Sequence, residues 1–285
     1  MISIVIPAHN EAEVIACCLQ QLVQDSDTLS LEIIVVCNGC SDNTAEVVRS
    51  FEQVMCVETD TASKPHALNL GDKEASYFPR FYLDADIRLS LGDIATVVAA
   101  MADDGVLAAA PKVQMDLTGS SWMVRSYYDI WCNLPYCREG MIGAGVYVLS
   151  EAGRARFVDF PDVLSDDIFI RDLFTTEERL GVTGAVSIIT APTSLGGLIK
   201  IKTRGRLGLY ELKARFPELM KNEGKTYGLA LKQLMGKVNL WPKVLVYLGI
   251  NIVTRMRARQ QSKTKGFAHW ERDESSRKKI KAKHD

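Results

Sequence analysis

Ile2-Ser3-Ile4-Val5-Ile6-Pro7 is a short run of apolar, mostly β-branched residues, and a polar turn and a helical pattern over residues 12–23 follow it. The run at residues 31–37 repeats this arrangement, with a helical pattern over residues 43–53. Continuous apolar runs of this length are typical of strands that are buried on both faces. The succession predicts a parallel sheet with helices on both faces, which binds ligands at the carboxyl ends of its strands.

Further strands and helices are expected up to residue 190. The expected strands lie at 54–58, 81–83, 106–111, 141–149 and 182–190, and the expected helices at 91–101, 122–131 and 165–175. Ser90 is the expected N-cap of the helix at 91–101, because a serine hydroxyl accepts a hydrogen bond from an unpaired N–H of the first turn. The first two thirds of the chain therefore predict an α/β fold.

Charge is divided unequally along the chain, although the formal net charge of the 285 residues is only −1. Residues 1–199 hold 12 Lys and Arg against 28 Asp and Glu, whereas residues 200–285 hold 22 against 7, so the net charges are −16 and +15. This asymmetry indicates an anionic partner for the basic segment: phospholipid, nucleic acid or a diphosphate substrate. We expect an α/β domain over 1–199, a basic helical extension over 200–260 and a charged, disordered tail over 261–285.

The cellular compartment is predicted from the amino-terminal residues and the cysteines. The first residues lack the basic flank, apolar stretch and cleavage site of a secretory signal, which predicts a protein that starts in the cytoplasm. The seven cysteines are an odd number, several of them lie in apolar segments, and we expect reduced thiols. Cys37-Asn38-Gly39-Cys40 has zinc-ligand spacing, but no second clean pair follows, so structural zinc is not favoured.

Two aspartates, Asp84 and Asp86, directly follow the apolar run at 81–83. Because side chains alternate along a strand, their carboxylates point the same way and can converge on one cation. Oxygen ligands favour Mg²⁺ or Mn²⁺, which commonly bind one or two carboxylates together with substrate phosphates. A solvated acidic turn is the alternative for so short a motif.

Four blocks at expected strand ends carry a family resemblance. They are Ile4-Val5-Ile6-Pro7-Ala8-His9-Asn10-Glu11, Val36-Cys37-Asn38-Gly39-Cys40-Ser41-Asp42-Asn43-Thr44, Lys64-Pro65-His66-Ala67-Leu68-Asn69-Leu70-Gly71 and Tyr82-Leu83-Asp84-Ala85-Asp86. In this order they resemble the nucleotide-binding half of the inverting family 2 glycosyltransferases, over roughly two thirds of the chain. The resemblance implies a GT-A (Rossmann-like) fold, with a mixed, mostly parallel sheet between helices. Residues 1–90 are then the nucleotide-binding half and residues 91–199 the acceptor-binding half.

The resemblance also implies which residues bind the donor, a nucleotide-activated sugar. Pro7, Ala8 and Glu11 line the base and ribose, and Asn38 belongs to the same set. Asp42 accepts a hydrogen bond from the base, and uracil suits this role because its ring N–H needs an acceptor. A helix N-cap is the alternative role for Asp42.

The diphosphate is expected to meet basic residues and the metal. Lys64 lies near the phosphates, and Asp84-Ala85-Asp86 contacts donor and metal, with Asp84 and Asp86 as ligands. The family often places a Gln-x-x-Arg-Trp block after its acidic pair, whereas this chain has Lys200-Ile201-Lys202-Thr203-Arg204-Gly205-Arg206. This departure favours a single-addition transferase over a processive polymer synthase. Arg204 and Arg206 are the residues that can neutralise the diphosphate.

The acceptor half carries two further matches. Gly143-Ala144-Gly145 matches the small-residue segment that makes room for sugar and acceptor, and Ser165-Asp166-Asp167 matches the acidic pair of the family. The resemblance implies that Asp167, the second acid, is the general base, since inversion requires the acceptor hydroxyl to lose its proton as it attacks. A structural role at a helix amino terminus is the alternative for both acids.

Two other functions compete with this interpretation. A sugar-phosphate nucleotidylyltransferase needs a Gly-rich phosphate loop with a basic residue after the first strand, where this chain has Ala8-His9-Asn10-Glu11. A non-catalytic relative that binds nucleotide sugar is the second alternative. The resemblance favours a hexosyltransferase of cell-envelope, exopolysaccharide or glycolipid synthesis that uses a UDP-sugar and a sugar or lipid-linked acceptor. No nucleic-acid partner is expected.

The apolar run at 240–254 is too short to span a membrane, which takes about 20 residues, and Lys243 and Asn251 interrupt it. With Trp241 at headgroup depth and the arginines that follow on anionic lipid, it can instead lie in the interface. The alternative is a helix that packs on the catalytic domain. The membrane interpretation predicts a peripheral enzyme on the inner face of the cell membrane.

Overall fold

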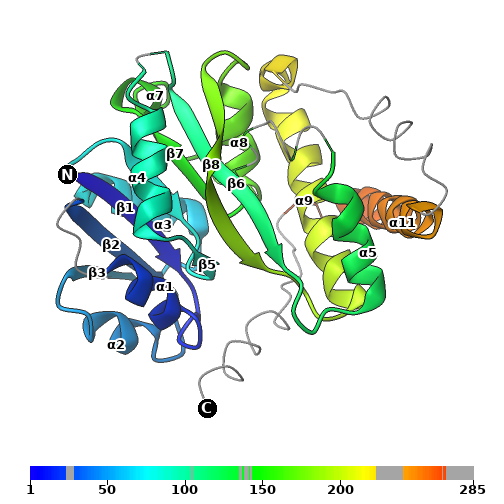
Figure 1. Ribbon diagram of the computed structural model, residues 1–285, viewed down its shortest axis with the longest axis horizontal. Coiled ribbons are helices and arrows are strands. Elements are labelled where there is room, and N and C mark those ends of the chain that lie inside the picture. Colours follow the sequence, from blue (N-terminus) through cyan, green and yellow to red (C-terminus); the bar gives the residue numbers. More distant parts are fainter. Residues whose placement is uncertain are drawn as a thin grey trace.

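The computed structural model describes residues 1–23, 29–103, 105–134, 137, 141, 143–222, 240–264 and 266–267. Within these residues, eight strands form one sheet in the order β3-β2-β1-β4-β7-β6-β8-β5 (Figure 1). The strands are β1 (Ile2–Ala8), β2 (Leu31–Asn38), β3 (Val54–Thr59), β4 (Arg80–Leu83), β5 (Ile87–Arg88), β6 (Ala108–Asp116), β7 (Val146–Leu149) and β8 (Arg179–Thr190). The helices are α1 (Ile15–Leu22), α2 (Thr44–Arg49), α3 (Lys64–Glu74), α4 (Leu91–Ala100), α5 (Trp122–Trp131), α7 (Glu151–Arg154), α8 (Asp166–Leu173), α9 (Leu195–Arg215), the 3₁₀ helix η1 (Pro217–Asn222) and α11 (Trp241–Thr264).

The sheet is mixed, and its direction changes beside the site. Strands β1 to β4 are parallel to one another, and β6 is parallel to β8, but β7 is antiparallel to both β4 and β6. Leu83, the last residue of β4, therefore pairs with Val146, the first residue of β7. The residues that follow β4 and those that precede β7 meet at one edge of the sheet. This architecture confirms the predicted α/β fold, with a mixed, mostly parallel sheet between helices.

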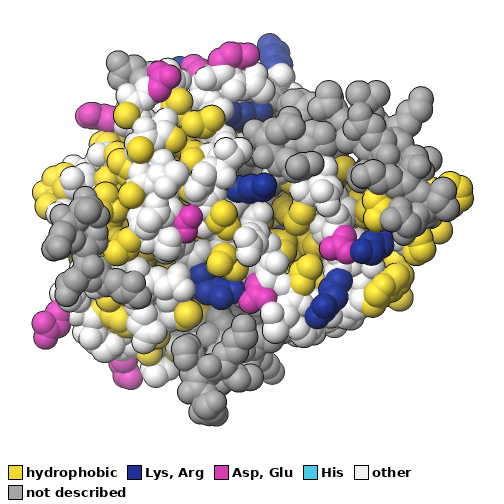
Figure 2. Space-filling model, in the orientation of Figure 1, with side chains coloured by type: hydrophobic (Ala, Val, Ile, Leu, Met, Phe, Trp, Pro, Cys, Tyr) yellow, Lys and Arg dark blue, Asp and Glu magenta, His cyan; other side chains and the backbone are white. Residues whose placement is uncertain are grey.

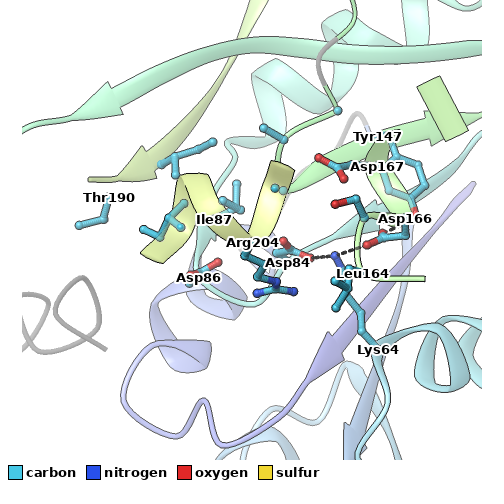
Figure 3. Close-up of a pocket in the computed structure, with 17 residues that line it drawn as sticks. Lys64, Asp84, Asp86, Ile87, Tyr147, Leu164, Asp166, Asp167, Thr190 and Arg204 are labelled. Atoms are coloured by element: carbon cyan, nitrogen blue, oxygen red, sulfur yellow. Dashed lines mark hydrogen bonds and ion pairs between the residues drawn. The ribbon is translucent and has the colours of Figure 1, made fainter. Parts of the chain in front are cut away.

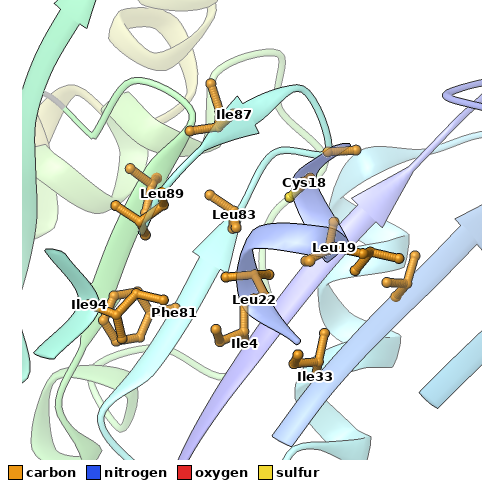
Figure 4. Packing of buried hydrophobic residues seen from close by; sticks show 14 of the residues in the cluster. Ile4, Cys18, Leu19, Leu22, Ile33, Phe81, Leu83, Ile87, Leu89 and Ile94 are labelled. Atoms are coloured by element: carbon orange, nitrogen blue, oxygen red, sulfur yellow. The ribbon is translucent and has the colours of Figure 1, made fainter. Parts of the chain in front are cut away.

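The two faces of the sheet hold separate cores, because successive side chains of a strand point to opposite faces. Ile4 and Ile6 of β1 pack with α1, α2 and α4, whereas Val5 between them packs with α3, α8 and α9. Figure 4 shows the first of these cores, where Phe81 and Leu83 of β4 lie beside Ile4. The strands that bear the site are thus buried on both faces, as their unbroken apolar runs predicted.

Serine side chains fix the starts of four helices. Ser63, Ser90, Ser150 and Ser194 each accept a hydrogen bond from the N–H three residues further on. This is the N-cap interaction that satisfies an otherwise unpaired donor of the first turn. The predicted N-cap at Ser90 is confirmed. Ser63 matters most for the site, because it starts α3 at Lys64.

The basic carboxyl-terminal part forms a helical layer beside the sheet. Helices α5, α9 and α11 pack together at one side of the molecule (Figure 1). Their shared core contains Tyr127, Tyr128 and Trp131 of α5, Leu198 of α9 and Ile250 of α11. Among the residues that the structure describes, no helix is both long and apolar enough to cross a membrane.

Several boundaries differ from those that the sequence predicted. The strand expected at 141–149 begins only at Val146, because Gly143 and Gly145 adopt positive φ angles of 68° and 75° and interrupt the extended backbone. Helix α9 begins at Leu195 and passes through the boundary expected at residue 199, and α11 continues to Thr264. Most of the tail expected at 261–285 lies outside the described residues. Strand β5 and the helices α3 and α7 have no counterpart among the expected elements.

Candidate active site

A pocket of about 300 Å³ lies where the end of β4 meets the start of β7 (Figure 3). Its walls come from segments far apart in the chain: Lys64 at the start of α3, the turn after β4, residues 143–147, residues 164–167 at the start of α8, the end of β8, and α9. Two helices, α3 and α8, thus begin at the pocket wall, and helix amino termini favour anions. The size of the pocket suits a sugar or a nucleotide fragment.

Lys64 links two carboxylates across the pocket. Its Nζ lies 2.7 Å from Asp84 Oδ1 and 3.0 Å from Asp166 Oδ1, as the dashed lines in Figure 3 show. Burial alone would lower the pKa of Lys64, but the attraction of Asp166 and Asp84 outweighs it and raises the pKa. Lys64 therefore stays protonated among these carboxylates. Its positive charge is the group in this acidic region that can bind a phosphate.

Asp166 and Asp167 have different surroundings although they are adjacent. Asp166 is 4% exposed, and its Oδ2 accepts a hydrogen bond from the Tyr147 hydroxyl at 3.0 Å. Burial and the neighbouring charge of Asp166 raise the pKa of Asp167 to about 6, against a partly offsetting effect of Lys64. A carboxylate with a pKa near the working pH is well suited to accept a proton from a hydroxyl. The geometry separates an anchored acid from a candidate base.

Glycines bring the metal motif to the acidic pair. The Asp84 N–H donates to the Gly145 carbonyl oxygen at 2.8 Å. At Gly145 a Cβ would lie 2.6 Å from Ile87 Cδ1, and its φ of 75° is one that only glycine adopts readily. Gly143 lies beside Asp167 and also has a positive φ. A larger residue at position 145 would push the β7 segment away from Asp84.

The chemistry of the two motif carboxylates suits a divalent cation held together with a substrate. Asp84 and Asp86 both line the pocket, and no group of three His, Cys, Asp or Glu side chains arranged to hold a metal is found in the described part of the chain. Burial, followed by the charges of Asp166 and Asp86, raises the pKa of Asp84, and Lys64 opposes this rise. Mg²⁺ is commonly held by one or two carboxylates together with substrate phosphates, and Asp84 and Asp86 supply two carboxylates on this pocket wall.

The residues assigned to the nucleotide lie apart from this pocket. Pro7, Ala8, Glu11, Asn38 and Asp42 do not line it. Pro7, Ala8 and Asn38 belong to the last residues of β1 and β2, and Glu11 and Asp42 lie in the loops that follow. In these loops Asn10 Oδ1 accepts from Ser41 N at 2.7 Å, and Asn38 at the end of β2 is 4% exposed. With its amide oriented to satisfy both neighbours, Asn38 donates to the Ala8 carbonyl oxygen at 2.8 Å and accepts from Ser63 N at 3.2 Å.

Asp42 is engaged by its own loop. Its Oδ1 accepts from Thr44 N at 3.0 Å and its Oδ2 from Ala12 N at 3.2 Å. Partial burial alone would raise the pKa of Asp42, but these hydrogen bonds and that of the Thr44 hydroxyl outweigh it and lower the pKa. The N-cap of α2 is Asn43, so Asp42 does not take the helix N-cap role that the sequence left as the alternative. It binds Thr44 N from the position before the cap.

Of the remaining predicted residues, some line the pocket and others do not. Arg204 lines the pocket, as do Gly143, Ala144 and Gly145, whereas Arg206 points to α11 and donates to Thr254 Oγ1 at 3.1 Å and to Asn251 Oδ1. The helix period explains this, because residues two apart on α9 face different directions. Ala85 is only 3% exposed and belongs to the core.

Other pocket residues were not expected from the sequence. They are Ile87, Tyr147, Leu164, Ser165, Ile189, Thr190, Ile201 and Gly205. Tyr147 lies two residues after Gly145, and a regular strand would place both on one face, but β7 begins only at Val146. Ile189, Thr190, Ile201 and Gly205 reach the pocket through the packing of β8 and α9, which no local pattern specifies, whereas Ile87 comes from β5 and Leu164 and Ser165 directly precede α8.

Solved structures resemble this fold along most of its length. The mannosyltransferase PcManGT from Pyrobaculum calidifontis, in complex with GDP-Man and Mn²⁺, matches with a TM-score of 0.60 and 19% identity over 93% of this chain and 75% of its own. S. aureus TarS 1-349 in complex with UDP-GlcNAc matches with a TM-score of 0.51 and 15% identity over 91% and 83%. The fold is that of the GT-A glycosyltransferases.

The sequence itself matches the family model described as Glycosyl transferase family 2 over residues 3–145, about half of the chain. The chain therefore belongs to glycosyl transferase family 2. A poly-beta-1,6-N-acetyl-D-glucosamine synthase from Staphylococcus epidermidis is 27% identical over 283 residues, which cover 89% of this chain and 65% of the synthase. The chondroitin synthase of Escherichia coli is 28% identical over 128 residues, 43% of this chain and 19% of that protein. The chain spans less than two thirds of the length of these curated relatives.

Proposed function

We propose that this family member is an inverting, divalent-metal-dependent hexosyltransferase that moves a sugar from a nucleoside diphosphate to an acceptor hydroxyl. The observation that carries the proposal is the position of Asp167, a partly buried carboxylate with a raised pKa on the wall of a pocket that also holds Lys64, Asp84 and Asp86. The pocket therefore combines a proton acceptor with groups that hold a diphosphate.

The residues then divide the reaction between them. Asp167 accepts the proton of the acceptor hydroxyl as its oxygen bonds to C1 of the sugar, and the bond from C1 to the diphosphate breaks on the opposite face. Lys64 and Arg204 neutralise the negative charge that collects on the leaving diphosphate. Asp84 and Asp86 would hold Mg²⁺ or Mn²⁺, which supplies further charge stabilisation at the phosphates.

A UDP-sugar is the favoured donor, and cell-envelope polysaccharide or glycolipid synthesis the favoured setting. Support comes from the names of the relatives, which include a poly-beta-1,6-N-acetyl-D-glucosamine synthase, and from TarS, which was crystallised with UDP-GlcNAc. The absence of a Gln-x-x-Arg-Trp block supports addition of a single sugar.

A screen of nucleotide sugars by thermal shift with and without Mn²⁺ tests this proposal. A donor present at a hundred times its Kd should add about 2.7 kcal/mol to the free energy of unfolding. The Asp167→Asn variant should give the same shift without transfer. If the wild type binds nucleotide sugars but never transfers, the non-catalytic alternative holds. Release of pyrophosphate from a nucleoside triphosphate and a sugar phosphate would instead identify a nucleotidylyltransferase.

We also propose that the enzyme is cytoplasmic and attaches peripherally to the inner face of the cell membrane through α11. One face of this helix packs into the protein, and the opposite face carries Trp241, Leu245, Ile252 and Met256, which are 53%, 68%, 58% and 66% exposed. Spacings of four, seven and four residues place them in one stripe. Arg255 and Arg259 are exposed beside its end, and Figure 2 shows apolar and basic side chains together at this side of the molecule.

Flotation with liposomes tests this attachment. Anionic vesicles should recover the protein, neutral vesicles should recover less, and added salt should weaken binding, since each Lys or Arg near such a surface contributes about 1 kcal/mol. The double variant Leu245→Ser, Ile252→Ser should lose recovery. Val158→Ser, which changes an 87% exposed apolar residue away from α11, is the matched control. Equal recovery of all three proteins would leave α11 as a packing helix only.

A further inference from the structure

Helix α3 contacts the segment that leads into the acidic pair at several places. At its start, Lys64 Nζ lies 3.0 Å from Asp166 Oδ1. About one and a half turns later, the Asn69 side chain binds the backbone of Phe160 twice. The Phe160 N–H donates to Asn69 Oδ1 at 2.7 Å, and Asn69 Nδ2 donates to the Phe160 carbonyl oxygen at 3.0 Å.

A third contact runs through Arg154. Asp72 of α3 accepts a hydrogen bond from Arg154 Nε at 2.8 Å. The same guanidinium donates to the carbonyl oxygens of Phe157 at 2.6 Å and Val158 at 2.8 Å. At about 100° per residue, positions 64, 69 and 72 lie within about 140° of one another around the helix. One face of α3 therefore fastens residues 157–166 at three points.

The Asn69 contact is specific to its amide. Phe160 is 3% exposed, so its backbone N–H and carbonyl oxygen have little access to water. A buried backbone group that loses its partner is costly, and only a side chain with both a donor and an acceptor serves the two groups at once. Asn69 does not line the pocket, so any effect that it has on the reaction must pass through this segment.

Both ends of the catalytic arrangement thus depend on α3. Lys64, its first residue, contacts Asp84 on the donor side, and Asn69 holds the segment that ends in Asp167. We propose that Asn69 is a positioning residue for Asp167, and that α3 sets the distance between the donor diphosphate and the base. This inference rests on the proposed function, in which Asp167 accepts the proton.

The test compares Asn69→Ala with Leu70→Ala in the full chain, by donor Kd, kcat and KM. Leu70 is the matched control, because it packs against Ile34 and Val36 of β2 and does not belong to the hydrophobic cluster that contains Phe160. Misplacement of a reacting group by about 1 Å can cost 10²-fold in rate. Asn69→Ala should therefore lower kcat by about 10-fold to 100-fold and leave the donor Kd within about twofold of the wild type. Leu70→Ala should lower the melting temperature without this loss of kcat.

A second variant covers the case in which Asn69→Ala does not fold. Arg154→Lys keeps a charge for Asp72 but cannot hold both Phe157 and Val158, so it should show the same fall in kcat at unchanged donor Kd. Equal kcat in Asn69→Ala and Leu70→Ala, or parallel losses of donor binding and kcat, would overturn the positioning role. Turnover in Asp167→Asn would instead show that the proposed base is wrong, which separates the two failures.

Discussion

Asp42 and Asp167 are both aspartates near the amino terminus of a helix, yet their pKa values shift in opposite directions. Asp42, at the end of β2, accepts hydrogen bonds from Thr44 and Ala12, which lower its pKa. Asp167, at the start of α8, is partly buried beside another carboxylate, and both the burial and that neighbouring charge raise its pKa, to about 6. The loop after β2 thus stabilises the ionised form of Asp42, whereas the pocket favours the protonated form of Asp167. Surroundings, and not residue type, give these two carboxyls opposite pKa shifts.

The largest expected effect is that of removing the base. Asp167→Asn keeps the shape of the side chain but cannot accept a proton, so we expect turnover to fall by about 10²-fold to 10⁴-fold. Donor binding, measured by calorimetry with UDP-sugar and Mn²⁺, should stay within about threefold of the wild type. If the variant loses donor binding at full kcat, the contrast between the two aspartates has been assigned the wrong way round.

The next largest effect is expected from the two acids of the proposed metal motif, Asp84 and Asp86. Asp84→Ala and Asp86→Ala should each lower transfer by about 10²-fold or more, since the loss of metal-held charge at the phosphates costs several kcal/mol of transition-state stabilisation. Circular dichroism should show an intact fold. Chelator should abolish wild-type transfer, and full activity in chelator would rule out a role for the metal.

The pH dependence follows from the raised pKa of Asp167. The base must be ionised, so kcat/KM should rise tenfold per pH unit below about 6 and level off above it. The same shift has a stability cost: a carboxyl with a raised folded pKa binds protons more tightly when folded, so the charged form destabilises the protein as pH rises from 3.8 through about 6. Asp167→Asn should therefore be more stable at pH 7.5, by at most about 3 kcal/mol, and should show no gain at pH 3. An unchanged melting temperature at both pH values would contradict the shift.

The smallest effect is expected at the donor-side loop. Asp42→Asn keeps an oxygen for the loop but removes the charge, so donor Kd should rise about threefold to tenfold while kcat is unchanged. Because the pKa of Asp42 is lowered, donor binding should be flat between pH 5 and 8, unlike kcat/KM. A fall in kcat without a change in donor Kd would remove Asp42 from the binding set.

The sequence predicted the fold for reasons that are local. Strands such as β1 and β2 are continuous apolar runs, and the Ser90 cap needs only its own helix. It also selected residues that the structure places around one pocket, among them Lys64, Asp84, Asp86 and Asp167. It did not distinguish Arg204 from Arg206, because that difference depends on which face of α9 meets α11.

The sequence by itself determined the order of most strands and helices, the asymmetry of charge, and the kinds of side chain available at each strand end. These follow from short-range periodicity and composition, which do not require a partner element. Only the tertiary structure decided that β7 runs antiparallel beside β4, that Lys64 joins Asp84 to Asp166, and that Asn69 holds Phe160 across 91 residues. The physical reason is that pKa values, burial and charge pairs depend on distances between segments, and the folded core sets those distances.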